Sequence, residues 1–415
     1  MKKKLLLLLA TTLLFSQCQT IIDDIPDFEP NTTSELCQES ENDCALVWAN
    51  NDFGFDLFKN IYQENQSENI FISPTSISTA LTMALNGADS DTYTEMYQML
   101  KYHQLSLDEV NHSYQSLLDL LPNWDPNVDM SIANSVWYDQ YFPVKNDFLT
   151  VNSDFLNSEV IDLDFKDPAS VNIINNWVND KTHEKIPTIL DQISDNAVMF
   201  LINAIYFKGD WRFTFPEEMT HEEAFHSSAD LSSTVDMMTF EGKVTMPYFS
   251  NDLFQAVDLP YGDSIYSMSV ILPNDGVAMD AVVDYLTPEH WDALAGDYTD
   301  TEIIFSMPKL KIKYDKMLNK NLKALGMQKA FTDRADFSKI SDQGVFISFV
   351  KHKSFLEINE AGTEAAAVTI IGIETTSVGI DPTPAVLLNK PYLLAIRDNK
   401  TNSLFFIGHI YNPNE

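Results

Sequence analysis

Residues 360–373 read Glu-Ala-Gly-Thr-Glu-Ala-Ala-Ala-Val-Thr-Ile-Ile-Gly-Ile, a stretch of small side chains that follows a strand-like run over residues 346–358. Alanine is a poor strand former, so this stretch does not favour a permanently paired central strand. Its alternate positions nevertheless form one face that grows more apolar along the chain: Thr363, Ala365, Ala367, Thr369, Ile371 and Ile373. The spacing alone leaves two interpretations open. The stretch is either a segment that can exist as exposed loop or as inserted strand, or a flexible alanine-rich connector.

The rest of the chain divides into a helix-rich first part and a strand-rich second part. Apolar residues recur at helical spacing over residues 46–61, and a second helical pattern follows Pro74 and ends near Gly87. Further helices are predicted over 114–121 and 171–181, and strands over 131–138, 198–207, 244–248, 255–259, 268–272, 303–307 and 404–409. No interdomain linker separates the two parts. We therefore predict one α+β domain over residues 44–415.

The N-terminal residues resemble an export signal rather than part of the fold. Three lysines precede an apolar run from Leu5 to Phe15, which is too short to span a membrane. We predict a signal peptide over residues 1–17, a polar tether over residues 18–43, and an exported protein. It would be a cell-envelope lipoprotein, in the periplasm or at the cell surface, or an extracellular protein.

The chain has three cysteines, all near its N-terminus. Cys18 stands where a bacterial lipoprotein carries its lipid, although Gln17 fits the usual small-residue pattern poorly, and simple signal removal is the alternative. Cys37 and Cys44 lie seven residues apart, and an oxidising compartment would allow a disulfide between them. Neither has the neighbouring Cys or His residues of a zinc site.

The composition limits the partners. The 415 residues include 26 Lys and Arg against 61 Asp and Glu, a formal net charge of −35, and 45% are hydrophobic, which is enough for a large core. So negative a surface repels nucleic acid and acidic membranes, and it lacks the basic stripe that binding to a glycosaminoglycan would require. The membrane would be reached only through the N-terminal lipid. The alternative is a solubility surface with no specific role.

Signatures of enzymes are missing. The sequence has no GxSxG elbow, P-loop, HExxH or GxGxxG pattern. His183-Glu184 begins like a zinc-protease motif but lacks the second histidine, and Asp89-Ser-Asp91 lacks the rest of a calcium loop and is expected to start a helix. We expect no catalytic residues, no metal and no cofactor.

Six blocks of sequence, spread from Trp48 to the C-terminus, follow one another in an order that is typical of one family. They are Asn69-Ile-Phe-Ile-Ser-Pro-Thr-Ser-Ile77, Ile174-Asn-Asn-Trp-Val178 with Thr182 and Lys185-Ile186, Asn203-Ala-Ile-Tyr-Phe-Lys-Gly-Asp-Trp211, His352-Lys353, Asn359-Glu360 with Gly362-Thr-Glu-Ala-Ala-Ala367, and Asn389-Lys-Pro-Tyr392 through Gly408 and Pro413. Together the blocks resemble the serpins.

The resemblance implies a fold of three β-sheets and about eight or nine helices, held in a metastable state with an exposed reactive-centre loop. In that family the target protease cuts the loop and becomes acylated. The freed loop then inserts as a new strand into the central sheet and distorts the attached protease. The physical principle is β-strand addition driven by release of stored strain. Such a protein is a single-use serine-protease inhibitor and not an enzyme.

The resemblance also assigns three groups of residues. The hinge, where insertion starts, comprises Glu360, Gly362, Thr363, Glu364, Ala365, Ala366, Ala367, Val368 and Thr369. The shutter group, beneath the point where the sheet opens, comprises Ser73, Ser76, Asn203 and His352, which are expected to hydrogen-bond one another when buried. The breach group, where the loop first enters, comprises Trp211, Lys309 and Glu360. Tyr392 stands where the family usually has Phe, so its hydroxyl needs a partner or contact with water.

Two features of the loop bear on its activity. The inward positions are small (Thr363, Ala365, Ala367 and Thr369), and no proline occurs between Glu360 and Pro382. Both features allow the loop to insert as a strand. They therefore favour an inhibitor over a non-inhibitory binding or storage protein that is cleaved as a simple substrate.

Family spacing from Glu360 places the scissile bond between Thr376 and Ser377, whereas counting back from Asn389 places it near Ile380. No Arg or Lys lies between Lys353 and Lys390, so elastase-like or subtilisin-like serine proteases are the expected targets, with some cysteine proteases as further candidates. We expect the protein to be a monomer.

Overall fold

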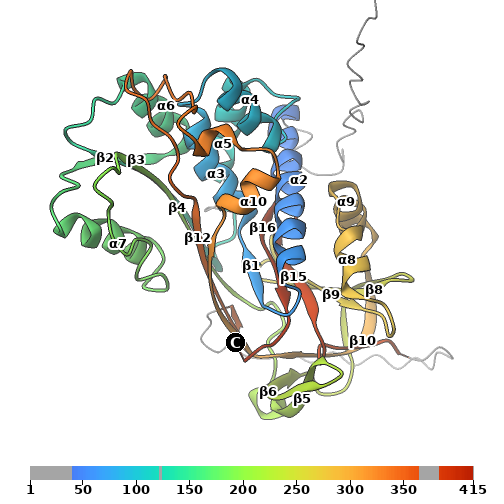
Figure 1. Cartoon of the computed structure of the whole chain (residues 1–415). Coiled ribbons are helices and arrows are strands. Elements are labelled where there is room, and N and C mark those ends of the chain that lie inside the picture. The colour runs from blue at the N-terminus through green and yellow to red at the C-terminus, as the bar shows by residue number, and fades with distance from the viewer. Residues whose placement is uncertain (1–39, 121–123, 364–382, 415) are drawn as a thin grey trace, which may run out of the picture.

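Figure 1 shows the computed structural model of the chain, which describes residues 40–120, 124–363 and 383–414. Nine α-helices lie in these residues. They are α2 (Glu41–Glu64), α3 (Pro74–Leu85), α4 (Ser90–Met99), α5 (Leu107–Leu120), α6 (Asn146–Leu156), α7 (Ala169–Lys181), α8 (Met279–Tyr285), α9 (Pro288–Asp297) and α10 (Asn319–Ala324).

Local sequence explains several helix starts. Ser40 caps α2 by accepting a hydrogen bond from the backbone N–H of Asp43, and Ser73 caps α3 in the same way, followed by Pro74 in the first turn. The side chain of Asp89 caps α4 by accepting from the N–H of Ser90, so Asp89-Ser-Asp91 starts a helix as predicted.

The central sheet contains six strands in the order β11-β12-β13-β4-β2-β3. They are β11 (Leu310–Met317), β12 (Lys351–Asn359), β13 (Gly362–Thr363), β4 (Met199–Asp210), β2 (Val128–Asp139) and β3 (Ser158–Leu163).

The predicted strand that begins near Phe346 is wrong at its start. Residues 344–350 are in no regular element, because Ile347 donates its N–H to the Ala330 carbonyl and Val350 donates to Asn319 Oδ1.

The remaining strands form two further sheets that share β10 (Thr299–Pro308). The first contains β1 (Ile70–Ile72), β16 (Leu404–Ile410), β15 (Tyr392–Asp398), β9 (Tyr266–Pro273), β8 (Phe254–Pro260) and β7 (Val244–Ser250). The second contains β6 (Leu231–Thr239), β5 (His221–Ser228) and β14 (Ala385–Leu387). Residues 299–303 of β10 pair with β7, and its later residues pair with β14 and β6. The predicted three-sheet α+β fold is confirmed.

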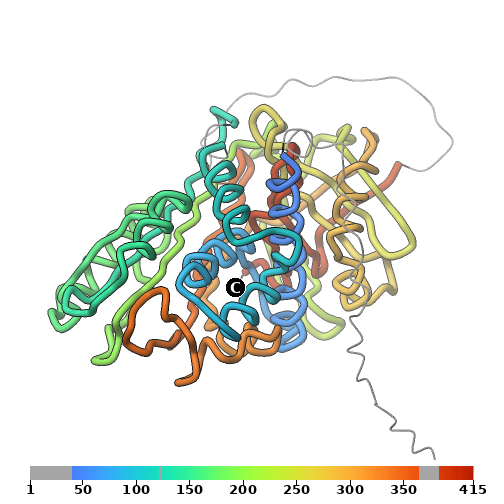
Figure 2. Tube along the Cα trace, turned by 90° about the horizontal axis from the view of Figure 1, so that it is seen from above, coloured from blue at the N-terminus to red at the C-terminus, as the bar shows by residue number. Residues whose placement is uncertain are grey.

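The layers can be followed in two views. Figure 1 places the helices around α2 on one side of the sheets, with α7 alone beside the far end of β2 and β3. Figure 2, turned by 90°, places the green segment that contains α7 at one side of the molecule and the yellow α8–α9 segment at the other, with α2 between them. The segment after α7 therefore lies close to β4 and β12, where the candidate site is found.

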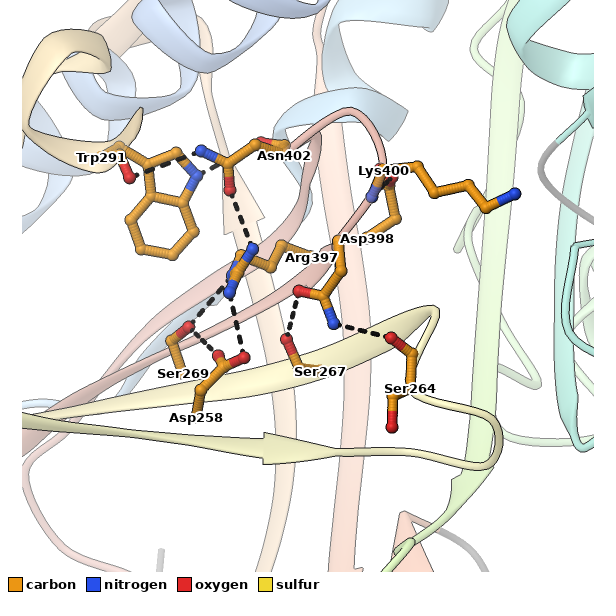
Figure 3. A network of polar contacts seen from close by, with 10 residues as sticks. Asp258, Ser264, Ser267, Ser269, Trp291, Arg397, Asp398, Lys400 and Asn402 are labelled. Atoms are coloured by element: carbon orange, nitrogen blue, oxygen red, sulfur yellow. Dashed lines mark hydrogen bonds and ion pairs between the residues drawn. The ribbon is translucent and has the colours of Figure 1, made fainter. Parts of the chain in front are cut away.

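A buried ion pair ties β8, β15 and α9 together (Figure 3). The Arg397 guanidinium donates from Nη2 to Asp258 Oδ2 at 3.0 Å, and from Nη1 to Asn402 Oδ1 at 3.3 Å. Ser269 donates to the other carboxylate oxygen of Asp258, and the Trp291 indole donates to the Asn402 carbonyl. Because both charges are buried, these additional hydrogen bonds are needed to offset the loss of hydration.

Tyr392, at the start of β15, carries a buried polar group that is not satisfied in this way. Its side chain is 0% exposed, and its hydroxyl has no hydrogen-bond partner among the described residues. Within the described residues, the partner or water contact expected for this hydroxyl is not found. Its ring packs edge-on to Phe225 in an apolar environment, and burial raises the pKa of the hydroxyl.

Replacing Tyr392 with Phe is expected to stabilise the protein. The change removes a buried hydroxyl without a partner, whose desolvation costs roughly 1–3 kcal/mol, and keeps the ring. Denaturant unfolding should show a higher midpoint. Tyr62→Phe is the matched control, because the Tyr62 hydroxyl donates to Asp280 Oδ1 at 2.9 Å, and this variant should lose stability. A lower midpoint for Tyr392→Phe would show that its hydroxyl has a partner in solution.

Candidate functional site

The candidate site is a gap in the central sheet. Strand β13 consists of only two residues, and it pairs antiparallel with both neighbours, with Thr363 opposite Ile358 of β12 and Gly209 of β4. Beyond these residues β12 pairs with β11 and β4 pairs with β2, while no pairing joins β12 to β4 in the described part of the sheet. Two strand edges therefore face each other, with only the first two residues of a strand between them.

A pocket opens directly beside Thr363 along these edges. Its lining comes from β4, from β12 and from the end of α7 with the segment after it: Ile205, Tyr206, Phe207, Phe355, Glu357, Thr182, Lys185 and Ile186. The Thr363 side chain is itself buried, with 2% of its surface exposed. The pocket thus lies where further residues after Thr363 would go if β13 were longer.

Two members of the breach group, together with Thr220, form a tight polar contact. Lys309 Nζ lies 2.8 Å from Glu360 Oε1, and the Thr220 hydroxyl donates to the same oxygen at 2.6 Å. Burial opposes the ionisation of Glu360, but the hydrogen bonds from Lys309 and Thr220 outweigh it and hold the pKa of the carboxyl below its usual value. The ionised Glu360 therefore fixes the beginning of the hinge.

Trp211 holds the backbone of the same segment. Its backbone N–H donates to the Ala361 carbonyl at 2.8 Å, and its indole N–H donates to the Asn359 carbonyl at 3.0 Å. The Asn359 side chain accepts from the N–H groups of Ala361 and Gly362. The structure therefore brings the three breach residues together around the start of β13.

The shutter group is only partly connected. The N–H of Ser73 donates to His352 Nε2 at 3.2 Å, and the N–H of Ser76 donates to Ser73 Oγ at 3.2 Å. The expected bond from Asn203 to these residues is wrong. Asn203 lies on β4, across the gap from His352, and its Nδ2 instead donates to Asn134 Oδ1 at 2.6 Å.

The side-chain oxygen of Asn203 accepts no hydrogen bond from the described residues. This atom, Oδ1, is also buried. An unpaired buried acceptor is costly, and an exception of this kind calls for an explanation. Asn203 and His352 lie on β4 and β12, the two strands whose edges face the gap, so an additional strand between them would pass beside both residues.

Buried histidines should make stability depend on pH. Burial lowers the pKa of His352 to about 4, with Asp315 opposing the shift, and burial likewise lowers that of His409 to about 4. The folded state thus keeps both imidazoles neutral at pH values where the unfolded chain, with a pKa near 6.5, is protonated. Each histidine therefore contributes stability above about pH 6.5 that is lost as the pH falls towards 4.

We expect each histidine to account for about 2 kcal/mol of lost stability between pH 7 and pH 5. Denaturant unfolding of His352→Gln and His409→Gln at both pH values should show a correspondingly smaller loss than the unsubstituted protein. His103→Gln, at an exposed position, is the control. Equal pH dependence in all four proteins would contradict the neutral buried state.

Several predicted positions lie outside the described residues. They are Cys18, Cys37, Glu364, Ala365, Ala366, Ala367, Val368, Thr369, Thr376, Ser377 and Ile380. Cys44 is disulfide-bonded, and because both other cysteines lie outside the described residues, its pairing with Cys37 stays a prediction.

Three residues that contact the hinge or the shutter group were not assigned from the sequence. Thr220 bonds Glu360, Asn134 bonds Asn203, and the Tyr261 hydroxyl lies 2.7 Å from the Thr363 hydroxyl. Only Tyr261 gave a local signal, as the middle residue of a Pro-Tyr-Gly turn.

The described residues contain neither a candidate metal cluster nor a candidate membrane-spanning helix. Within them, no group of three or more His, Cys, Asp or Glu side chains is placed to hold a metal ion. None of the helices in the same part of the chain combines the length and apolar character that a membrane span needs.

Comparison with known proteins gives a consistent result. The family model "Serpin (serine protease inhibitor)" matches residues 48–413. Human alpha-1-antichymotrypsin is 30% identical over 401 residues, which cover 93% of each chain.

Two solved structures share the fold. The native state of tengpin, a thermophilic serpin, has a TM-score of 0.80 and 33% identity, covering 88% of this chain and 94% of that chain. Human thyroxine-binding globulin in complex with thyroxine has a TM-score of 0.81 and 26% identity, covering 90% of this chain and 100% of that chain. The order of strands around the gap, the hinge contacts and these matches agree, and the chain belongs to the serpin family.

Proposed function

We propose that this protein is a suicide inhibitor of serine proteases that acts by inserting its cleaved loop between β12 and β4. The observation that carries the proposal is β13, which already occupies the first two positions of the missing strand. The facing edges of β12 and β4 offer backbone donors and acceptors to a strand that continues from it.

The register of β13 defines where the following residues would lie. Continued without a slip, the strand would place Ala365 between Leu356 and Phe207, and Ala367 between Ser354 and Ile205. The neighbours on these two edges are buried, so only small inward side chains fit. The alanines of the hinge satisfy this requirement.

The same register brings Thr369 between His352 and Asn203. The Thr369 hydroxyl could then donate to Asn203 Oδ1, the buried acceptor that lacks a partner among the described residues. Insertion would thus connect the two sides of the gap and satisfy a polar group at the shutter. This contributes to the free energy that drives insertion.

We propose elastase-like or subtilisin-like serine proteases as targets, with some cysteine proteases as further candidates. The loop between Lys353 and Lys390 contains no Arg or Lys, and a trypsin-like pocket requires a cation. The scissile bond is proposed between Thr376 and Ser377, within a window that extends to Ile380. The proposal also retains a monomeric, exported protein, attached to the cell envelope through Cys18 if that residue is lipidated.

The test is to incubate the protein with elastase, subtilisin and trypsin and look for complexes that survive SDS. We expect complexes with elastase or subtilisin, and the mass of the released C-terminal fragment should identify the bond that was cut. Proteases whose active-site serine has been chemically blocked are the control. Complexes with trypsin alone would refute the proposed specificity, and simple cleavage by every protease would refute trapping.

A second candidate is a non-inhibitory binding protein. Its support is the likeness to thyroxine-binding globulin, whose structure contains bound thyroxine. In this case the loop would be cleaved as an ordinary substrate and would not insert. The small inward residues of the hinge and the position of Thr363 in the sheet favour the inhibitor.

A further inference from the structure

Tyr261, in the turn after β8, is held rigidly beneath the start of the hinge. Its side chain is fully buried and stacks on Trp211, with 4.5 Å between the ring centroids and an interplanar angle of 14°. Phe207 packs against it edge-on at 5.0 Å. Packing against both rings restrains the tyrosine ring, so its hydroxyl oxygen has a defined position beside β13.

That oxygen contacts the last described residue of the hinge. The hydroxyls of Tyr261 and Thr363 are 2.7 Å apart and share a hydrogen bond inside the protein. Thr363 has 2% of its surface exposed, so no solvent competes for either group. Loss of one hydroxyl would leave the other buried without a partner, which is costly.

Gly362 and Gly209 allow only one register of β13 against β4. A Cβ at Gly362 would lie 2.2 Å from the carbonyl oxygen of Gly209, and the φ angle of Gly362 is +155°. A Cβ at Gly209 would lie 2.8 Å from the Tyr261 ring. A slip of one residue would bring Ala361 or Thr363 to the place of Gly362, where neither fits.

The sequence that follows cannot set the alignment by itself. Ala365, Ala366 and Ala367 are identical, so their side chains do not distinguish one register from the next. A slip of one residue turns every side chain of a strand to the opposite face, and it would direct Glu364 towards the core. The register must therefore be specified before the alanines are reached.

We propose that Tyr261 is a positioning residue that fixes the register of the incoming strand through its hydrogen bond with Thr363. The proposal rests on the proposed inhibition by loop insertion and identifies the contact from which insertion is aligned. Gly362 and Gly209 supply the close backbone approach, and Tyr261 supplies the directional contact. Tyr261 touches neither the protease nor the scissile bond.

The test compares Tyr261→Phe, Thr363→Val and the double variant, each of which removes a hydroxyl and nearly preserves shape. The first measurement is amide hydrogen exchange of residues 359–363 in the uncleaved protein. Loss of one buried hydrogen bond should speed exchange at Gly362 and Thr363 by about fivefold. Tyr392→Phe is the control, because it removes a buried tyrosine hydroxyl that bonds nothing among the described residues.

The second measurement is the ratio of released, cleaved inhibitor to trapped complex with a protease that the unsubstituted protein traps. Each single variant should raise this ratio several-fold, and the double variant should be no worse than either single one, because both remove the same bond. Fully additive effects, or unchanged exchange and partition in Tyr261→Phe, would overturn the proposal. If the unsubstituted protein trapped no protease, the proposed function would fail, and hydrogen exchange would still decide whether Tyr261 holds Thr363.

Discussion

Thr363→Arg is expected to abolish trapping while leaving cleavage of the loop intact. Thr363 is buried between β12 and β4, and its hydroxyl lies 2.7 Å from that of Tyr261. Burying an unpaired guanidinium costs several kcal/mol, so β13 would leave the sheet and insertion would have no starting point. Such a penalty should shift the ratio of released to trapped inhibitor by roughly 100-fold or more.

The measurement is the number of inhibitor molecules consumed per protease inactivated, with complexes separated on SDS gels. Glu364→Arg is the control, because it introduces the same side chain one residue later, at a position that strand alternation would direct away from the core. Thr363→Ser, which keeps a small hydroxyl side chain, should also trap. If Thr363→Arg trapped as well as these two variants, insertion between β12 and β4 could not be the mechanism.

Cleavage within the loop should raise the midpoint of thermal unfolding by about 10 °C or more. The new strand would pair with both β12 and β4, and a dozen or more ladder hydrogen bonds contribute roughly 0.5–1.5 kcal/mol each. It would also bury the inward side chains of the hinge and supply a donor to Asn203 Oδ1. The uncleaved chain has none of this pairing beyond Thr363 in the described residues.

The experiment compares calorimetric scans of the intact protein and of protein cut by a protease that it does not trap. The cut form of Thr363→Arg is the internal control, since its loop cannot insert, and its midpoint should stay near that of the intact protein. Equal midpoints for intact and cut unsubstituted protein would favour the binding or storage alternative.

Much of the fold could be predicted from the sequence, because the apolar periods are strong and the turn signals clear. The helices around Leu46–Ile61 and after Pro74, and strands such as β4 and β9, lie close to where the spacing places them. The predicted strand from Phe346 failed at its start for a physical reason: the N–H groups of Ile347 and Val350 bond the Ala330 carbonyl and the Asn319 side chain instead. The spacing of apolar residues does not reveal hydrogen-bond partners that lie in other segments of the chain.

The candidate site was predictable in type but not in detail. The small inward face of the hinge could be read directly, because side-chain size and alternation are properties of the sequence. The partners of Thr363 and Asn203 could not, since Tyr261 is 102 residues away from Thr363 and Asn134 is 69 residues away from Asn203. The first contact depends on how the turn after β8 packs against the central sheet, and the second on the register of β2 against β4. No local pattern encodes either.

The position of β15 and β16 has a consequence for the molecule after the loop is cut. Every residue of both strands is buried, and they pair with each other, with β9 and with β1. A cut between residues 364 and 382 therefore separates the covalent chain into two pieces whose contacts run through the core. Folding of the intact chain is unimolecular, but the cut protein can regain its structure only when two separate chains meet. Its heat denaturation should accordingly depend on protein concentration and lose reversibility on dilution.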